Sequence, residues 1–179
     1  MMTWAQWRDL HPGTLVLSKR MNGGLQGMSG GYGRYHASPD IGVTGTLRRA
    51  WDGVDPKARV VSFVVEGRAF SVLLDDLDSN LILESTGDGR RVLVVGSPDR
   101  TTATMFLPES GGWSYSGNEQ GRTILLNRET GAEWDGYTGR PLDPSSTERP
   151  LEAIAGTTSY WFAWKTFYPE TRLLRRSDD

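Results

Sequence analysis

The residues best suited to recognise a ligand follow a glycine-rich stretch near the start of the chain. They are Tyr32, Arg34, Tyr35, His36 and Asp40. Aromatic rings, a guanidinium, an imidazole and a carboxylate make directional contacts with small polar molecules, and flexible segments often carry such groups. We therefore expect these five residues to contribute to a binding site, with His36 at the centre of any catalysis.

The same stretch contains the three residue types of a hydrolytic triad. Ser38 lies between His36 and Asp40 in the sequence. Residues this close together in one loop rarely point at a common centre, whereas a triad needs its three groups in one line of hydrogen bonds. The pattern therefore disfavours a serine hydrolase.

Trp134 is the sixth candidate residue, and acidic side chains surround it in the sequence. These are Glu129, Glu133 and Asp135. Two carboxylates beside an indole that carries a sugar ring would suit a glycosidase. Packing of Trp134 in the core is the alternative, and it is favoured because large aromatic side chains mostly contribute buried area.

The composition gives little support to metal or cofactor sites. The chain has no cysteine, and its two histidines are His11 and His36, which excludes a thiolate zinc site and a three-histidine site. The acidic cluster Asp75-Asp76-x-Asp78 lacks the spaced oxygen ligands and terminal glutamate of an EF-hand loop. One histidine combined with carboxylates remains open as a ligand set, but we expect neither a metal nor a cofactor.

Charge and hydrophobicity argue against two classes of partner. The formal net charge is -2 at pH 7, and Lys19, Lys57 and Lys165 are the only lysines. Nucleic-acid-binding proteins concentrate basic residues on one face, so we expect no nucleic-acid partner. The longest apolar runs have the length of a strand, and the first residues do not have the pattern of a signal peptide. We therefore expect no membrane association and a cytoplasmic location.

The middle of the chain alternates short apolar runs with turn residues. Residues 59–65 and 68–74 flank Glu66-Gly67, a two-residue link typical of a β-hairpin. Further runs, separated by glycine, proline or asparagine, lie at residues 81–83, 91–95, 101–107, 112–115 and 123–126. Short strands at this spacing predict a meandering sheet, closed into a barrel or folded into a sandwich.

Two copies of one pattern bracket these strands. The N-terminal Trp motif, residues 4–17, begins Trp4-x-x-Trp7-Arg8-x-Leu10-His11-Pro12-x-Thr14, and the C-terminal Trp motif, residues 161–174, begins Trp161-x-x-Trp164-Lys165-x-Phe167-Tyr168-Pro169-x-Thr171. Apolar positions three apart, followed by a proline, predict one to two turns of helix leading into a short strand. We expect the motifs to organise the fold, with Trp7 and Trp164 packed in the core.

The chain is predicted to form a single domain over residues 1–179. Its length and its hydrophobic content of 37% are sufficient for one core. Residues 22–40 are rich in glycine and are expected to form a loop. Residues 143–150 are polar and are expected to form an exposed linker.

These features resemble a bacterial family catalogued as domain of unknown function 3179. The resemblance rests on the two Trp motifs, on Gly31-Tyr32-Gly33-Arg34-Tyr35 and on Glu129-Thr130-Gly131-x-x-Trp134-Asp135-x-x-x-Gly139. Members often carry two tandem units that each close with the Trp motif, so the resemblance implies one unit preceded by the tail of another. Members commonly have a Cys-Pro-Leu-x-Gly segment where this chain has Gly96-Ser97-Pro98-Asp99-Arg100-Thr101. The resemblance implies no established activity.

The sequence therefore predicts a mainly β fold, with a single barrel-like or sandwich-like antiparallel or mixed sheet and two short helices. For function it predicts a domain that binds a small ligand or a partner, without assigned catalysis. One alternative is a hydrolase or metal-dependent enzyme centred on His36 and nearby carboxylates. A purely structural interaction module is the other. Whether Arg34, Tyr35, His36 and Trp134 line one pocket would separate these functions.

Overall fold

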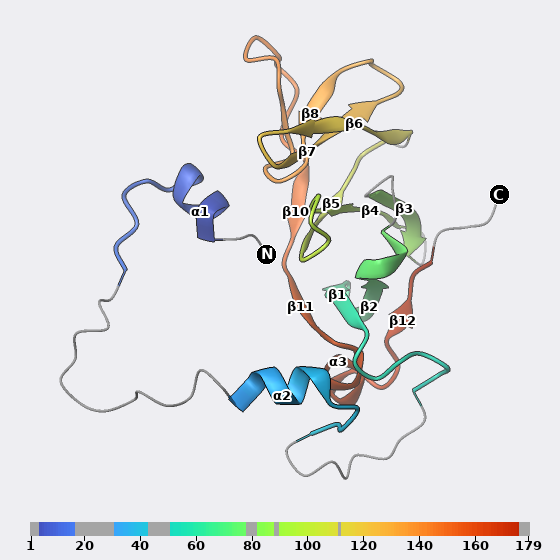
Figure 1. Cartoon of the computed structure of the whole chain (residues 1–179). Coiled ribbons are helices and arrows are strands. Elements are labelled where there is room, and N and C mark those ends of the chain that lie inside the picture. Colours follow the sequence, from blue (N-terminus) through green and yellow to red (C-terminus); the bar gives the residue numbers. More distant parts are fainter. Residues whose placement is uncertain are drawn as a thin grey trace. The chain divides into compact units, whose positions relative to one another are not determined.

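The computed structural model describes residues 4–16, 31–42, 51–77, 82–87, 90–110 and 112–175. The chain divides into two units, one from Met2 to Lys57 and the other from Ala58 to Asp179. We call them the N-terminal unit and the β unit, since every strand of the described residues belongs to the second one (Figure 1). The prediction of a mainly β fold is confirmed.

Three four-stranded sheets make up the described part of the β unit. Sheet A has the strand order β11 (Gly156–Tyr160), β1 (Arg59–Val65), β2 (Arg68–Leu73) and β12 (Arg172–Leu173). Sheet B has the order β10 (Glu152–Ile154), β5 (Ala103–Leu107), β4 (Arg90–Gly96) and β3 (Ile82–Gly87). Sheet C has the order β6 (Trp113–Glu119), β7 (Arg122–Asn127), β8 (Glu133–Asp135) and β9 (Arg140–Pro141). Three open sheets thus replace the single sheet that was predicted, and none of them closes into a barrel.

The predicted hairpins are present. Strands β1 and β2 pair antiparallel around Glu66 and Gly67, whose φ angles are 50° and 76°. Strands β3 and β4, and strands β6 and β7, also pair antiparallel. Strand β11 was not predicted, because its residues, Gly156–Tyr160, contain no apolar run. It takes this conformation by pairing with β1 in the register Val61↔Thr158.

Sheet B lies between the other two sheets, with a hydrophobic core on each face (Figure 1). Val92 and Val94 of β4 pack in the core shared with sheet A. Leu93 and Val95 of the same strand pack in the core shared with sheet C, which also contains Trp134. The continuous apolar run of β4 therefore reflects burial of both faces of one strand.

Strands β10 and β11 join sheets B and A at a corner. Ile154 of β10 pairs with Met105 of β5, and Gly156 of β11 pairs with Phe63 of β1. A Cβ atom on Gly156 would lie 2.0 Å from Met105 Cε and 2.9 Å from the carbonyl oxygen of Ser62. The corner therefore requires glycine, because the main chain of the neighbouring strand leaves no room for a side chain.

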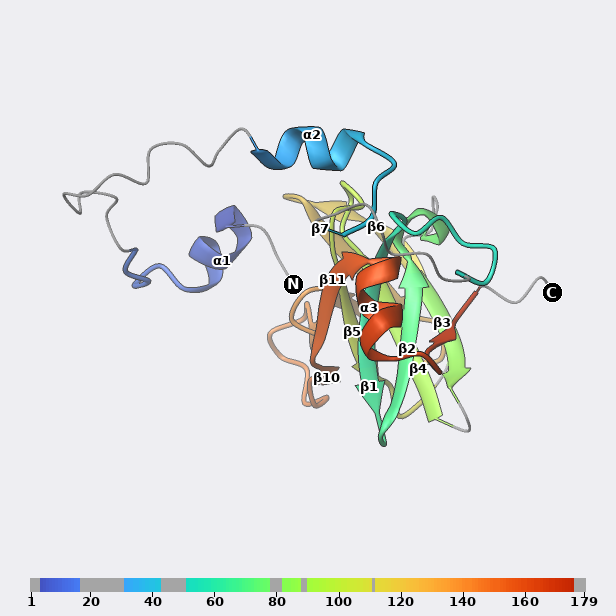
Figure 2. The same cartoon turned by 90° about the horizontal axis from the view of Figure 1, so that it is seen from below.

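The C-terminal Trp motif covers the face of sheet A that points away from sheet B. Its helix α3 (Trp161–Phe167) follows β11 directly and contacts β11 and β1, as the view in Figure 2 shows. Strand β12 then pairs parallel with β2 at the edge of the sheet. The predicted helix and short strand are both present in this copy.

The N-terminal unit carries the other copy. Helix α1 (Trp4–Leu10) is the helix predicted for the N-terminal Trp motif. The expectation that Trp7 packs in the core is wrong, because its side chain is 40% exposed. Trp164 at the matching position is half-buried against the β unit. The described part of the N-terminal unit has no strand on which the first copy could pack.

Helix α2 (Gly31–Ala37) lies inside the predicted loop of residues 22–40, so that prediction is wrong for these seven residues. Glycine within a helix costs about 0.5–1 kcal/mol relative to alanine, which is why a helix was not expected. Lys57 offsets part of this cost. Its ammonium group donates to the carbonyl oxygens of Tyr35 and Ser38 at the C-terminal end of the helix. With α2, the described residues hold three α-helices in place of two, and η1 (Leu74–Asp76) is a short 3-10 helix.

Candidate functional site

The predicted binding residues fall in both units. Tyr32, Arg34, Tyr35 and His36 lie in α2, and Asp40 follows that helix. Trp134 lies in β8 of the β unit. The side chains of Tyr32 and Arg34 lie outside the described part of the chain. That all six residues form one site remains a prediction, and each group is therefore considered within its own unit.

Within the N-terminal unit, Tyr35 is the centre of a small polar cluster. The ammonium nitrogen of Lys57 lies 4.0 Å from the centroid of the Tyr35 ring, and the exposed imidazole of His36 meets that ring edge-on at 6.0 Å. The Tyr35 hydroxyl accepts a hydrogen bond from the Gly42 amide at 3.3 Å. Lys57 was missed by the sequence analysis, because no local pattern links two residues 22 positions apart.

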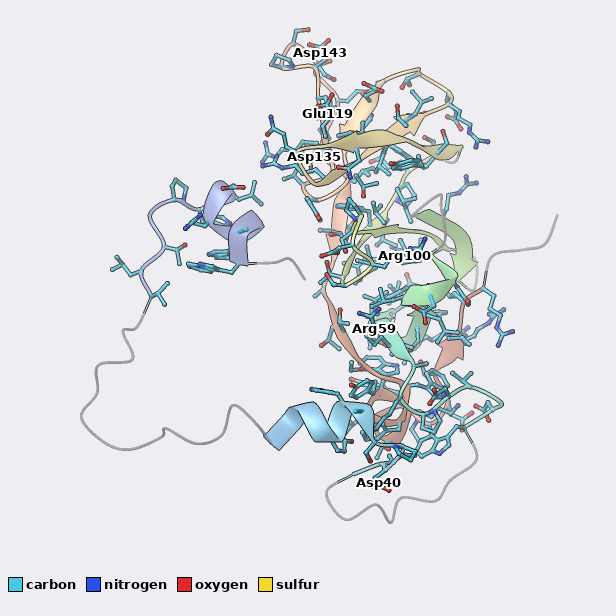
Figure 3. The ribbon with its side chains drawn as sticks, viewed as in Figure 1. Asp40, Arg59, Arg100, Glu119, Asp135 and Asp143 are labelled. Atoms are coloured by element: carbon cyan, nitrogen blue, oxygen red, sulfur yellow. The ribbon has the colours of Figure 1, made fainter. Side chains whose placement is uncertain are left out.

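Ser38 and Asp40 form a local turn. The Ser38 hydroxyl donates to Asp40 Oδ2 at 2.8 Å and accepts from the Asp40 amide at 2.9 Å (Asp40 is labelled in Figure 3). In a hydrolytic triad the serine proton would go to an imidazole. This bond therefore supports the reading that disfavours a hydrolase at Ser38. Another serine in a pattern typical of hydrolases is Ser29, in the Gly-x-Ser-x-Gly sequence Gly27-Met28-Ser29-Gly30-Gly31. It lies outside the described residues.

Within the β unit, Trp134 packs edge-on against Trp113. Their ring centroids are 5.4 Å apart at an interplanar angle of 84°. Trp134 is 4% exposed and Trp113 is 5% exposed. The Trp113 indole donates to the carbonyl oxygen of Ser110 at 3.1 Å, whereas the buried Trp134 Nε1 has no partner among the described residues. Trp134 is therefore mainly a core residue, with a small remaining surface.

That remaining surface lines a cleft of about 390 Å³, which we call the Trp cleft. Residues from three segments line it: the end of β5 and the loop after it, the facing ends of β6 and β7, and residues 148–152 before and within β10. The predicted linker of residues 143–150 thus supplies part of one wall. Sequence analysis missed this wall, because residues 148–152 carry no signal beyond their polarity.

Charged side chains line the Trp cleft beside the two indoles. Glu109, Glu148 and Glu152 contribute carboxylates, and Arg149 contributes one guanidinium. Asn127, which is buried, also lines the cleft. Its Oδ1 accepts from the amides of Glu129 and Thr130 at 2.9 and 3.3 Å. The cleft combines aromatic surface with an excess of negative charge.

Two of the acidic residues next to Trp134 in the sequence, Glu133 and Asp135, accept hydrogen bonds from neighbouring groups. Asp135 is buried, and its Oδ2 accepts from Arg122 at 3.1 Å (Figure 3). Its Oδ1 accepts from the amides of Tyr137 and Thr138 at 2.8 and 2.9 Å. Glu133 accepts from the Ser116 hydroxyl at 2.5 Å. Asp135 therefore fixes the turn after β8, and its carboxylate is already fully engaged.

Residues 96–102 form a hydrogen-bonded turn after β4. The buried Ser97 hydroxyl donates to Asp99 Oδ1 at 2.6 Å and accepts from the amides of Thr101 and Thr102 at 3.2 and 3.1 Å. Hydrogen bonds from Ser97, and then from the hydroxyl and amide of Thr101, lower the pKa of Asp99 below its ordinary value. These groups hold the turn together and leave no exposed nucleophile at Ser97.

The described part of the chain contains neither a cluster of metal-ligating side chains nor a helix that could cross a membrane. No three histidine, aspartate or glutamate residues of that part lie close enough together to hold an ion. None of its helices has the length and apolarity that crossing a bilayer requires.

Comparisons with known proteins identify one relationship. No curated protein and no solved structure matches the chain. A family model described as "Protein of unknown function (DUF3179)" matches residues 1–171, which is nearly the whole chain. The chain therefore belongs to the DUF3179 family.

Proposed function

We propose that the β unit binds a small organic cation in the Trp cleft. The observation that carries this proposal is the composition of the cleft, which three glutamates and one arginine line together with two edge-on indoles. A cation is attracted to the face of an indole and to carboxylates, and both attractions grow when water is partly excluded. A neutral or anionic ligand would gain less from the same groups.

The size of the Trp cleft supports a small molecule. Its volume of about 390 Å³ lies within the range of roughly 300–1,000 Å³ that is usual for small-molecule pockets. The walls are also held in place before any ligand arrives. Asn127 caps the turn after β7, and the Leu151 amide donates to the carbonyl oxygen of Gly139 at 2.8 Å. A preformed wall lowers the entropy that binding must overcome.

The residues of α2 are retained in this proposal as a second contact surface. His36 is exposed beside the Tyr35 ring, and Arg34 and Tyr32 share the same short helix. We expect replacement of Arg34 and His36 together by alanine to change the free energy of unfolding by less than about 1 kcal/mol. Weaker ligand binding in this double variant would support the α2 contact, and unchanged binding would remove it from the site.

The test of the proposed function has two steps. Native mass spectrometry of gently purified protein would first show whether a small molecule is retained. Binding would then be measured by tryptophan fluorescence with choline, a neutral hexose and a dicarboxylate at equal ionic strength. We expect choline to bind and the dicarboxylate not to bind.

Charge-neutral variants identify the site. Glu148→Gln and Glu152→Gln keep the side-chain shape and remove one charge each, so each should weaken choline binding by about fivefold or more. Glu119→Gln is the matched control, because this exposed carboxylate in β6 does not line the Trp cleft. Equal effects of all three variants, or no binding of any cation, would contradict the proposal.

A further inference from the structure

The two Trp motifs have the same local structure, 157 residues apart. Each forms a seven-residue α-helix, Trp4–Leu10 in the first copy and Trp161–Phe167 in the second. In both copies the second indole donates to the threonine hydroxyl at 2.9 Å, Trp7 to Thr14 and Trp164 to Thr171. The motif therefore has the same local structure in both units.

The ring that precedes the proline contacts the second indole in both copies. His11 lies 4.2 Å from Trp7 and Tyr168 lies 4.1 Å from Trp164, measured between ring centroids. The His11 amide donates to the Trp7 carbonyl at 2.8 Å, and the Tyr168 amide donates to the Trp164 carbonyl at 2.9 Å. Histidine at position 11 is thus explained as a packing ring.

The C-terminal copy shows what this motif packs on. Trp161 is 1% exposed, and its amide donates to the carbonyl oxygen of Ala58 just before β1 at 2.9 Å. Past the proline, β12 pairs parallel with β2 in the register Arg172↔Phe70, and the Leu174 amide donates to the carbonyl oxygen of Ser71 at 2.8 Å. The seat of the motif is therefore the edge of β2 that pairs with β12, together with the start of β1.

A chain of hydroxyl groups ties the motif to this seat. Thr171 Oγ1, which accepts from Trp164, lies 3.5 Å from Ser71 Oγ, and Ser71 Oγ lies 2.8 Å from Ser62 Oγ. Both serines are fully buried on the outer face of sheet A. The seat thus recognises the threonine of the motif as well as its apolar side chains.

The N-terminal copy presents the same groups to solvent. Trp4, the counterpart of the buried Trp161, is 50% exposed. Leu15 and Val16, the counterparts of Arg172 and Leu173 in β12, are 95% and 67% exposed. An apolar Leu-Val pair at these positions favours a strand at least as strongly as the Arg-Leu pair of β12.

We propose that the N-terminal Trp motif docks on a second copy of this chain, in the seat formed by the β2 edge and the start of β1. The matching local structure supplies the occupant, because this seat already accepts the same helix, the same hydroxyl and the same strand. The C-terminal motif of the second copy occupies the seat first and is linked to it covalently. Docking is therefore an exchange between chains, weak while the C-terminal motif is intact and stronger once that motif is loosened.

Sedimentation of the full chain over a wide concentration range tests the exchange. Trp161→Ala loosens the resident motif, so this variant should dimerise at least about tenfold more tightly than the parent chain. Adding Trp4→Ala should reverse that gain, because it removes the matching anchor of the incoming motif. Phe167→Ala is the control for nonspecific hydrophobic association. Phe167 is 81% exposed, so its replacement should leave dimerisation unchanged.

A direct probe covers the case in which Trp161→Ala does not fold. A fluorescent peptide of residues 3–17 should bind the parent chain and accelerate hydrogen exchange at the Leu174 amide, which it displaces from β2. The same peptide with Trp4→Ala should bind at least about tenfold more weakly. Failure of the parent peptide to bind, or equal binding of both peptides, would overturn the proposal. A loss of stability in Trp4→Ala at concentrations where the chain is monomeric would also overturn it, because the motif would then dock within its own chain.

Discussion

The two Trp motifs are the same local structure in two different environments. Both close an indole-to-threonine hydrogen bond of 2.9 Å, and both place the ring that precedes the proline against the second indole. Yet Trp161 is 1% exposed and Trp4 is 50% exposed. The comparison separates two levels of structure. Hydrogen bonds within about ten residues fix the shape of the motif, and burial depends on a sheet elsewhere in the chain.

The largest expected difference between the copies is in the first tryptophan. Trp161→Ala should lower the free energy of unfolding by about 3–5 kcal/mol, as truncation of a buried large aromatic does. Trp4→Ala should lower it by less than about 1 kcal/mol, because a half-exposed indole has little burial to lose. Denaturant midpoints of the two variants measure the difference, and equal losses would show that both copies are docked alike.

A smaller difference is expected for the threonine. Thr14→Val and Thr171→Val both remove the indole-to-hydroxyl hydrogen bond, so they share the local part of the effect. Thr171→Val also removes the contact with Ser71 in the buried hydroxyl chain, which should add about 1 kcal/mol of destabilisation. Thermal unfolding of the two valine variants gives this increment directly. Similar losses in both would mean that the hydroxyl chain does not contribute to docking.

Acid should weaken the β unit through a residue that belongs to neither motif. The pKa of Asp99 is lowered from its ordinary value of 3.8, chiefly by the Ser97 hydroxyl and also by Thr101. A depressed pKa in the folded state adds stability above the unfolded pKa, and this stability is lost as the pH falls through the folded pKa. Asp99→Asn should therefore flatten the decline in unfolding free energy below about pH 4. The same decline in Trp4→Ala as in the parent chain would show that the acid response belongs to the β unit.

The smallest expected effect is that of metal removal, for which we expect no change in stability. A chelator should leave the melting temperature unchanged in the parent chain and in the Trp4→Ala variant, since a structural metal would contribute free energy of folding. Calorimetry with and without EDTA measures this. A clear drop in the melting temperature of the parent chain would support a metal site of one histidine and carboxylates. If the drop were absent from Trp4→Ala, that site would lie beside the N-terminal Trp motif.

Much of the β unit could be predicted from the sequence because its signals are local. The Glu66-Gly67 link between apolar runs predicted the β1–β2 hairpin, and the motif pattern predicted α1 and α3. Strand β11 could not be predicted in this way, because it has no apolar run, and its partner β1 lies about a hundred residues earlier in the chain. The helix at Gly31–Ala37 was missed for a related reason, since Lys57 supports it from far along the chain.

The candidate site also has features that the sequence determined and features that only the tertiary structure determined. The sequence by itself determined which side chains could recognise a ligand, Trp134 and the residues of α2 among them, and it determined the shape of each Trp motif. Tertiary structure alone decided that Trp113 and residues 148–152 meet Trp134 around one cleft, and that one Trp motif is buried while its copy is exposed. The physical reason is the sequence separation of the contacts. A hydrogen bond across three to seven residues depends only on a short segment, whereas burial depends on surfaces that only the folded sheets bring together.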